Sequence, residues 1–301
     1  MQVIRSELLG FCMGVSRAVK MAQRVLQTRR VCKTGDSDSL ETVSGVYTMG
    51  PLIHNPRVLE DLGKSGIKIL KEGEIPPRNS TVIIRAHGIS PLVETALLAE
   101  KVNILDATCP YVKANQKTAR DYAEKGYWVF LAGEKNHGEI IGIRSYVKGA
   151  RCSVAADPAE AEAAAAKLFI SSEAARTVLI GQTTISAEEY RIIGESIMRF
   201  FPSLKIIDTI CKVAAERQKA LRELCGRVDA VIIAGGRDSA NTRRLQSLAE
   251  EMGKPAWIAE SPEDLPAEIA GCKTVGLCSG ASAPDDLITG IEEALKAINA
   301  V

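Results

Sequence analysis

Short apolar runs alternate with longer amphipathic stretches along the whole chain. The short runs are rich in valine and isoleucine and end in small or polar residues, which is typical of buried strands, while the longer stretches have helical spacing. Strands are predicted at 45–50, 80–86, 102–105, 127–133, 176–181, 229–236 and 273–280. Strands that alternate with helices indicate an α/β fold with parallel sheets, in which ligands bind beyond the carboxyl ends of the strands.

The same order of elements occurs three times, and each time a cysteine opens a helical stretch. A strand with a polar loop follows the helix, and then a second strand with a second polar loop. The distance from the cysteine to the second loop is similar in each case: 75 residues from Cys12 to His87, 74 from Cys109 to Thr183 and 71 from Cys211 to Ser282. This period indicates one αβ unit used three times. We therefore expect three similar α/β domains in a pseudo-three-fold arrangement, at 14–108, at 109–207, and at 1–13 joined with 208–301.

The first unit is longer than the others between its cysteine and its first polar loop. Cys12 lies 42 residues before His54, whereas Cys109 lies only 28 residues before His137. The excess falls in the polar stretch 31–45, VCKTGDSDSLETVSG, which we interpret as an inserted surface loop.

The composition excludes several classes of protein. Hydrophobic residues make up 46% and charged residues 25% of the 301 residues, as in ordinary globular proteins, and the net charge of +1 gives no indication of a nucleic-acid partner. No apolar run approaches the ~20 residues that span a bilayer, and the first residues lack the pattern of a signal peptide. The cytoplasm is therefore the expected compartment, where eight cysteines favour ligands and thiols over disulfides.

The three cysteines that open helices, Cys12, Cys109 and Cys211, are candidate metal ligands. Three units around one axis would bring their thiols to one centre, and a helix N-terminus favours the thiolate. Three thiolates suit zinc, with a histidine as fourth ligand, or a cubane iron–sulfur cluster that leaves one iron open. The remaining cysteines do not open helices and are interpreted as small apolar residues or exposed thiols: Cys32, Cys152, Cys225, Cys272 and Cys278.

Polar residues in the strand-end loops form a second candidate site. The three histidines of the chain, His54, His87 and His137, all lie in these loops. Ser239, Asn241 and Ser282 stand in small-residue loops beside predicted helix starts, where backbone N–H groups can bind phosphate oxygens, and His54 and His87 can donate further hydrogen bonds. The alternative is that the serines and the asparagine are only helix N-caps.

A carboxylate accompanies the third histidine. Glu139 follows His137 by two residues, and this pair could carry protons to a leaving hydroxyl group. Thr183, in the second loop of the same unit, could relay the proton or hold the hydroxyl. The alternative is that Glu139 caps the helix predicted from the segment GEIIGIRSYV.

With these motifs the sequence resembles the LytB (IspH) family of 4-hydroxy-3-methylbut-2-enyl diphosphate reductases over nearly its whole length. The matching segments are GFCMGVSRAV, IHN, AHGIS, DATCP, HGE, QTTIS, DTIC, RQ, SANTRRL and SGASAPD. The resemblance implies the last step of the non-mevalonate isoprenoid pathway. In that step two electrons and two protons remove an allylic hydroxyl as water and yield isopentenyl and dimethylallyl diphosphates. It also implies one [4Fe–4S] cluster per chain at the centre of three α/β domains, and an electron donor such as ferredoxin or flavodoxin.

The resemblance further implies roles for individual residues. Cys12, Cys109 and Cys211 would be the cluster ligands. The diphosphate would be bound by His54, His87, Ser239, Asn241 and Ser282. The hydroxymethyl end would be surrounded by His137, Glu139 and Thr183, with Glu139 supplying protons. The chain departs from the family pattern at Ala240, where a second serine is frequent, and at Ala214 and Ala215, where threonines are frequent.

Two other functions fit part of the pattern. A lyase of the quinolinate-synthase type also combines three related domains, three cysteines and an open cubane cluster, although its own motifs do not occur here. An iron–sulfur or zinc sensor would need the cysteines but not the polar loops. Both remain alternatives to the reductase at this level.

Overall fold

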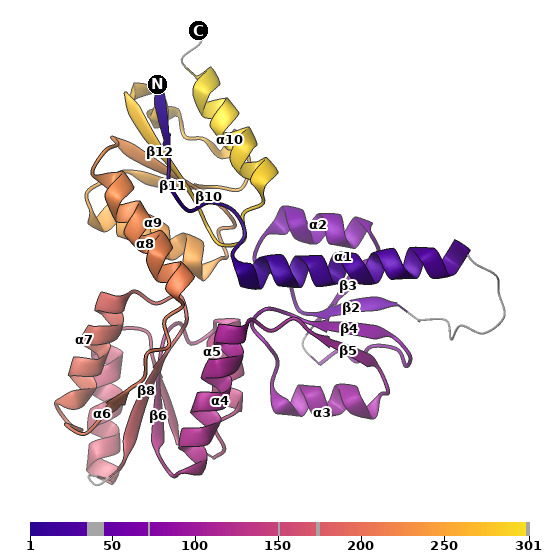
Figure 1. Ribbon diagram of the computed structural model, residues 1–301. Helices are drawn as coiled ribbons and strands as arrows, with labels where there is room; N and C mark the ends of the chain where they lie inside the picture. Colours follow the sequence, from indigo (N-terminus) through magenta and orange to yellow (C-terminus); the bar gives the residue numbers. More distant parts are fainter. Residues whose placement is uncertain (35–44, 72, 150, 173–174, 299–301) are drawn as a thin grey trace. The chain divides into compact units, whose positions relative to one another are not determined.

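The computed structural model describes residues 1–34, 45–71, 73–149, 151–172 and 175–298 (Figure 1). Within these residues the chain forms three four-stranded parallel sheets with helices packed against them. The α/β class and the parallel sheets predicted from the sequence are therefore confirmed.

One sheet has the order β3-β2-β4-β5. Its strands are β2 (Val46–Met49), β3 (Ile67–Leu70), β4 (Thr81–Ile84) and β5 (Asn103–Asp106). The helices between them are α2 (Pro56–Lys64) and α3 (Pro91–Ala99).

A second sheet has the order β7-β6-β8-β9. Its strands are β6 (Trp128–Ala132), β7 (Cys152–Ala155), β8 (Thr177–Gly181) and β9 (Lys205–Ile206). Its helices are α4 (Pro110–Glu124), α5 (Gly138–Ser145), α6 (Pro158–Ser171) and α7 (Ala187–Met198).

The third sheet joins the two ends of the chain in the order β1-β12-β10-β11. Its strands are β1 (Gln2–Arg5), β10 (Ala230–Ala234), β11 (Ala256–Ala259) and β12 (Thr274–Ser279). Its helices are α8 (Lys212–Cys225), α9 (Ala240–Glu251) and α10 (Asp285–Ala297), with 3₁₀ turns at Pro262–Asp264 and Ala267–Gly271. β1 lies parallel to β12, with Gln2 opposite Thr274, as expected for a unit made from both ends of the chain.

The three sheets share one strand order. In each, the strand that leads to a cysteine lies at one edge, and next to it comes the strand of the second polar loop, then the strand of the first polar loop, then an outer strand. This common order confirms the prediction of three similar α/β units.

Residues on the two faces of the second and third sheets pack against different helices. In the second sheet Phe130 and Leu179 lie in a core with Ile193 of α7, whereas Val129 and Val178 lie in a separate core with other helices. Burying each such aliphatic or aromatic side chain contributes about 1.5–3 kcal/mol, so the sheets are firm supports for the loops at their ends.

The contacts divide the chain into two compact units. One contains Met1–Glu41, Gly50–Ile69 and Lys212–Val301, and the other contains Thr42–Met49 and Leu70–Cys211. Because this division cuts through the first predicted domain, the boundaries at residues 108 and 207 stay a prediction.

The helix α1 (Met13–Thr34) corrects one detail of the predicted insertion. The first four residues of the predicted insertion, 31–34, form the end of this helix, because no glycine or proline interrupts the chain between Gly14 and Gly35. Residues 35–44 of the insertion lie outside the described residues. Among the described residues, none of the helices combines the length and the apolar character needed to cross a membrane.

Candidate functional site

Cys12, Cys109 and Cys211 occupy equivalent positions, each after the edge strand of one sheet and directly before or at the start of a helix. The backbone N–H of each donates a hydrogen bond to a carbonyl in the loop after the neighbouring strand. The acceptors are Ala281 for Cys12 at 3.0 Å, Ala86 for Cys109 at 2.9 Å and Thr183 for Cys211 at 2.8 Å. Each cysteine therefore stands where the chain leaves one sheet and begins a new helix.

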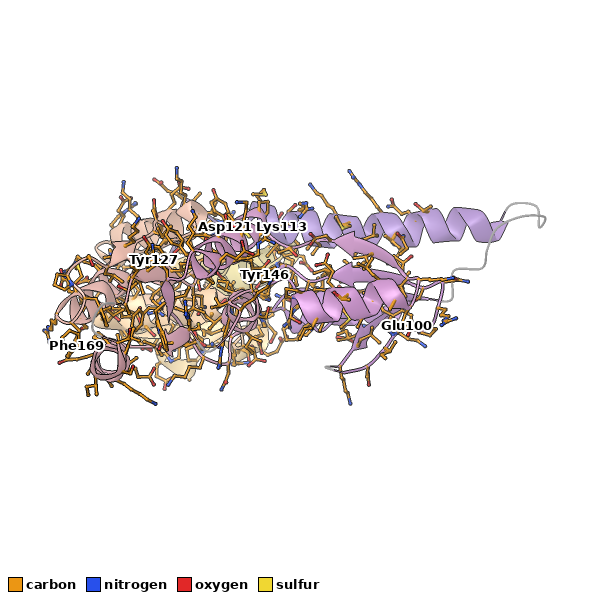
Figure 2. The ribbon with its side chains drawn as sticks, turned by 90° about the horizontal axis from the view of Figure 1, so that it is seen from below. Glu100, Lys113, Asp121, Tyr127, Tyr146 and Phe169 are labelled. Carbon is orange, nitrogen blue, oxygen red and sulfur yellow. The ribbon has the colours of Figure 1, made fainter. Side chains whose placement is uncertain are left out.

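Polar contacts fix the turn that carries Cys109. The carboxylate of Asp106, the last residue of β5, accepts a hydrogen bond from the Thr108 N–H at 2.9 Å. It also forms an ion pair with Lys113, which lies one turn into α4; Figure 2 labels Lys113. The exposed pair itself contributes little to stability, but the two contacts join β5 to α4 on either side of the cysteine.

The three thiols fit the ligands of an iron–sulfur cluster or of another thiophilic metal. All three cysteines are partly exposed, and the N–H of Val15, in the first turn of α1, points to the Cys12 sulfur at 3.5 Å. Burial raises the pKa of the Cys152 thiol to about 11 and also raises that of the fully buried Cys278 thiol, which makes these two thiols poor ligands. What distinguishes Cys12, Cys109 and Cys211 from the other cysteines is their shared position at the start of a helix after an edge strand.

The carboxylate of Glu139 is buried against Thr183. Only 1% of Glu139 is exposed, and its two oxygens accept hydrogen bonds from the backbone N–H and the hydroxyl of Thr183, both at 2.8 Å. The two residues meet because β6 and β8 are neighbours in the second sheet, with Ala132 opposite Gly181. Burial raises the pKa of Glu139 to about 7, and the hydrogen bonds from Thr183 oppose this shift.

The N-cap of α5 is His137, not Glu139. The Nδ1 atom of His137 accepts a hydrogen bond from the Glu139 N–H at 3.2 Å, and this bond begins the helix. The alternative that Glu139 serves as the helix cap is therefore wrong. Its side chain is directed to Thr183 instead.

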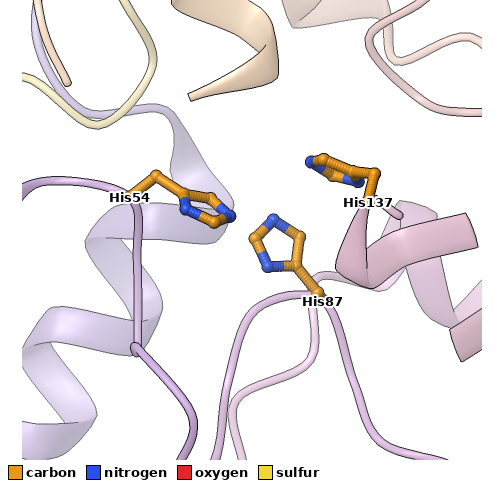
Figure 3. A group of neighbouring side chains, drawn as sticks. All are labelled: His54, His87 and His137. Carbon is orange, nitrogen blue, oxygen red and sulfur yellow. The ribbon is translucent and has the colours of Figure 1, made fainter. Parts of the chain in front are cut away.

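His87 joins this group from the loop after β4. Its ring meets that of His137 edge-on, with centroids 5.1 Å apart and planes at 77° (Figure 3). The loop turns at Gly88, whose φ of +73° favours glycine and whose Cβ, if present, would lie 2.5 Å from the Gln116 amide nitrogen. The same amide donates to the His87 carbonyl at 3.4 Å, so α4 supports the loop.

The other predicted site residues lie in the first compact unit. The hydroxyl of Ser282 donates to the backbone carbonyl of His54 at 2.9 Å. Gly236 also approaches this carbonyl so closely that a Cβ there would lie 2.7 Å from its oxygen. The loops after β2, β10 and β12 therefore pack tightly together, and His54, which Figure 3 also draws, is held by its backbone.

The first turn of α9 combines a cap with an unsatisfied donor. The Ser239 hydroxyl accepts from the Thr242 N–H at 3.3 Å, so Ser239 is an N-cap, as one interpretation of these serines proposed. Asn241 is only 6% exposed, and among the described residues its side-chain nitrogen has no hydrogen-bond partner. A buried amide without a partner costs about 1–3 kcal/mol, which a bound anion would recover.

The predicted site residues thus fall into two groups, each within one compact unit. The first unit holds Cys12, His54, Ser239, Asn241 and Ser282. The second holds Cys109, Cys211, His87, His137, Glu139 and Thr183.

Sequence reasoning missed several buried polar residues near these loops. Asn55 caps α2 by accepting from the Val58 N–H at 3.1 Å, and the signal for it was an asparagine before a proline. Asn115 and Arg217 are also buried, on α4 and α8; Arg217 lies in the matching segment RQ but received no role, and for Asn115 only its polar character on a buried helix face could have indicated one.

The family of the chain follows from comparison with known proteins. A family model described as LytB protein matches residues 3–296. The chain belongs to the LytB family. This membership confirms the resemblance that the sequence motifs indicated.

Members of the LytB family from several bacteria are similar to the chain throughout. The 4-hydroxy-3-methylbut-2-enyl diphosphate reductase of Treponema denticola is 38% identical over 299 residues, which cover 98% of this chain and 99% of that protein. The protein of the same name from Aquifex aeolicus is 36% identical, with 98% and 96% covered.

Two solved structures share the LytB fold. The E-1-hydroxy-2-methyl-but-2-enyl-4-diphosphate reductase from Plasmodium falciparum gives a TM-score of 0.86 at 25% identity and covers 97% of this chain and 87% of its own. A second structure, described as (E)-4-hydroxy-3-methyl-but-2-enyl diphosphate reductase, the terminal enzyme of the non-mevalonate pathway, gives 0.67 at 35% identity and covers 99% and 100%.

Proposed function

We propose that this member of the LytB family is a 4-hydroxy-3-methylbut-2-enyl diphosphate reductase, the last enzyme of the non-mevalonate isoprenoid pathway. The single observation that carries the proposal is full-length similarity, at 38% identity, to a protein of that name. The comparisons confirm the prediction of an oxidoreductase, since the named relatives are reductases.

In this proposal Cys12, Cys109 and Cys211 hold one [4Fe–4S] cluster per chain. When bound, this group would pass on, one at a time, the two electrons that an external donor provides for the removal of the allylic hydroxyl. The proposal is supported by the equivalent backbone positions of the three cysteines and by their partial exposure.

Glu139 acts as the proton donor. A hydroxyl group leaves carbon more readily as water, so a proton must reach its oxygen during the reaction. A carboxyl group with a pKa of about 7 is about half protonated at neutral pH and can both give and regain a proton there. The hydroxyl of Thr183, bonded to Glu139, relays the proton or orients the substrate hydroxyl, and His137 starts the helix that carries Glu139.

His54, His87, Ser239, Asn241 and Ser282 bind the diphosphate. The buried Asn241 amide, whose nitrogen finds no partner in the described part of the chain, supports this role, and the N-terminus of α9 adds backbone N–H groups and a favourable dipole. Ala240, in place of a second serine, removes one hydroxyl donor but keeps its backbone N–H in that first turn.

An electron donor such as ferredoxin or flavodoxin reduces the enzyme, and the cytoplasm is the proposed compartment. The two alternatives are less well supported. The family model that matches the chain is LytB, which does not support a lyase of the quinolinate-synthase type. A sensor would not require the buried hydrogen-bonded pair of Glu139 and Thr183.

Turnover with the diphosphate substrate tests the proposed function. Anaerobically purified protein, mixed with 4-hydroxy-3-methylbut-2-enyl diphosphate and a reduced viologen dye, should oxidise the dye and form isopentenyl and dimethylallyl diphosphates. Protein that contains an intact cluster but leaves the dye reduced would contradict the proposal.

A further inference from the structure

Two buried polar side chains stand at equivalent places on the helices that follow Cys109 and Cys211. Asn115 lies six residues after Cys109 on α4, and Arg217 lies six residues after Cys211 on α8. Each is 5% exposed. Neither belongs to the groups assigned above to the cluster, the diphosphate or the proton.

Asn115 joins two segments of the second compact unit. Its side-chain nitrogen donates to the carbonyl of Gly181, the last residue of β8, and to the carbonyl of Thr209, both at 3.3 Å. Thr209 stands two residues before Cys211. Its hydroxyl also accepts from the Gly181 N–H at 2.8 Å, so the same pair of segments is joined twice.

Arg217 makes the corresponding contacts in the first compact unit. Its guanidinium donates to the carbonyl of Ser279, the last residue of β12, at 3.1 Å and to the carbonyl of Gly10 at 2.6 Å. Gly10 stands two residues before Cys12. A further bond reaches the Leu8 carbonyl at 3.3 Å, and the Gly10 N–H donates to the Ser279 hydroxyl at 2.9 Å.

The two sets of contacts follow one rule. In both, the side chain six residues after one cysteine binds two carbonyls. One belongs to the last residue of the strand that precedes a second polar loop. The other stands two residues before the next cysteine, where Cys211 follows Cys109 and Cys12 follows Cys211. The residue six positions after Cys12 is Ala18, whose methyl group has no donor. The backbone before Cys211 and the backbone before Cys12 are therefore held in this way. The backbone before Cys109 lacks such a donor, so Cys109 serves as an internal comparison.

We propose that Asn115 and Arg217 are positioning residues, each of which fixes the backbone that carries the next cysteine. Asn115 positions Cys211, and Arg217 positions Cys12. As a statement about the cluster this rests on the proposed function, because it takes the cysteines as ligands. As a statement about the backbone it rests only on the hydrogen bonds.

The side chains of Asn115 and Arg217 are buried and hydrogen-bond to backbone carbonyls. Loss of these bonds releases the backbone before the cysteine and leaves those carbonyls without this donor. Removal of a net hydrogen bond worth about 1.4 kcal/mol changes the population of an open segment by about tenfold. The effect is specific to one cysteine, which separates positioning from a general loss of stability.

Alkylation of the metal-free protein tests this specificity. The variants Asn115→Leu and Arg217→Met keep much of the side-chain volume and remove the donors, and iodoacetamide labelling of each cysteine is followed by mass spectrometry. Asn115→Leu should speed the labelling of Cys211 by about tenfold and leave Cys109, on its own helix, unchanged. Arg217→Met should speed the labelling of Cys12 and not that of Cys109.

Gln246→Leu is the matched control, because the Gln246 side-chain amide donates a hydrogen bond to the Ala256 carbonyl at 3.1 Å, and this bond involves none of the segments that carry Cys12, Cys109 and Cys211. It should leave all three labelling rates unchanged. Equal acceleration of every cysteine, or of none, in folded Asn115→Leu and Arg217→Met proteins would overturn the proposal. If circular dichroism shows that Arg217→Met does not fold, Arg217→Lys replaces it, since the ammonium cannot span the same carbonyls.

A second measurement uses the protein loaded with its cluster. Under anaerobic conditions with an iron chelator, Asn115→Leu should lose iron about tenfold faster than wild type and Gln246→Leu at the wild-type rate. Wild-type protein that takes up no iron would contradict the proposed function, yet the labelling test would still decide the positioning role. Wild-type rates of iron loss in both positioning variants would contradict the positioning role alone.

Discussion

Replacement of Glu139 by glutamine separates its chemical role from its structural role. The substitution keeps the size of the side chain and leaves groups that can hydrogen-bond to the Thr183 N–H and hydroxyl, so the fold should be retained. It removes the only feature that the proposed mechanism uses, a proton that can be given up and regained. We expect the rate of reduction to fall by roughly 10²–10⁴-fold, the usual contribution of a positioned acid.

The stability of the variant gives an independent check. Burial raises the pKa of Glu139 from 4.5 to about 7, so the folded protein holds a proton that the unfolded chain has lost between these pH values. The wild type therefore loses stability as the pH rises from about 4.5 to 7, by up to about 3 kcal/mol in total. Glutamine does not titrate, so Glu139→Gln should lack this decline.

The assay measures both quantities on one preparation. Reduction of the substrate by the enzyme, with excess reductant present, is followed from about pH 6 to pH 8.5, and urea unfolding is measured from about pH 4 to pH 8.5, which covers the whole expected decline. The wild-type rate should fall above a pH of about 7, as Glu139 loses its proton, and the variant should be slow throughout. Glu188→Gln, an exposed change in α7, should behave as wild type. A normal rate of substrate reduction in Glu139→Gln would refute the role of Glu139 as proton donor.

Three further predictions concern the remaining site residues. Cys109→Ser should abolish or cripple the cluster while Cys272→Ser retains it, as iron and sulfide analysis will show; full iron content in Cys109→Ser would end the ligand assignment. Asn241→Ala should weaken binding of the diphosphate about 10- to 150-fold in calorimetry, since a hydrogen bond to a charged ligand contributes about 1.5–3 kcal/mol; unchanged affinity would exclude it from the pocket. Thr183→Val removes a hydrogen bond that lowers the pKa of Glu139, so the fall in rate should move to higher pH, and an unmoved pH profile would contradict the coupling of the two residues.

Local patterns were sufficient to predict the central strands and the cysteines. β8 and β10, for example, are buried at every residue, and such continuous apolar runs are visible in the sequence. Several edge strands were not predicted, because they are short and partly exposed: β3 has two consecutive exposed residues between the buried Ile67 and Leu70, and β9 has two residues, both exposed.

Contacts between distant residues could not be read from local patterns. The Asn115 amide binds a carbonyl 94 residues away and the Arg217 guanidinium one 207 residues away, so their roles appear only in the folded chain. The pairing of Glu139 with Thr183 was accessible from the repeat, because it placed both residues in loops of one unit. Only the structure shows the direct hydrogen bonds between Glu139 and Thr183, and only the structure shows that His137, not Glu139, caps the helix.

The most direct test of the proposed reductase counts electrons and products in one reaction. Protein reduced under anaerobic conditions is mixed with the allylic diphosphate and a measured excess of reduced viologen dye, the electrons consumed are counted from oxidation of the dye, and the products are quantified by mass spectrometry. We predict that each molecule of isopentenyl or dimethylallyl diphosphate formed consumes two electrons and releases one water. Product formation without electron consumption, or an unchanged substrate in the presence of an intact reduced cluster, would contradict the proposed function.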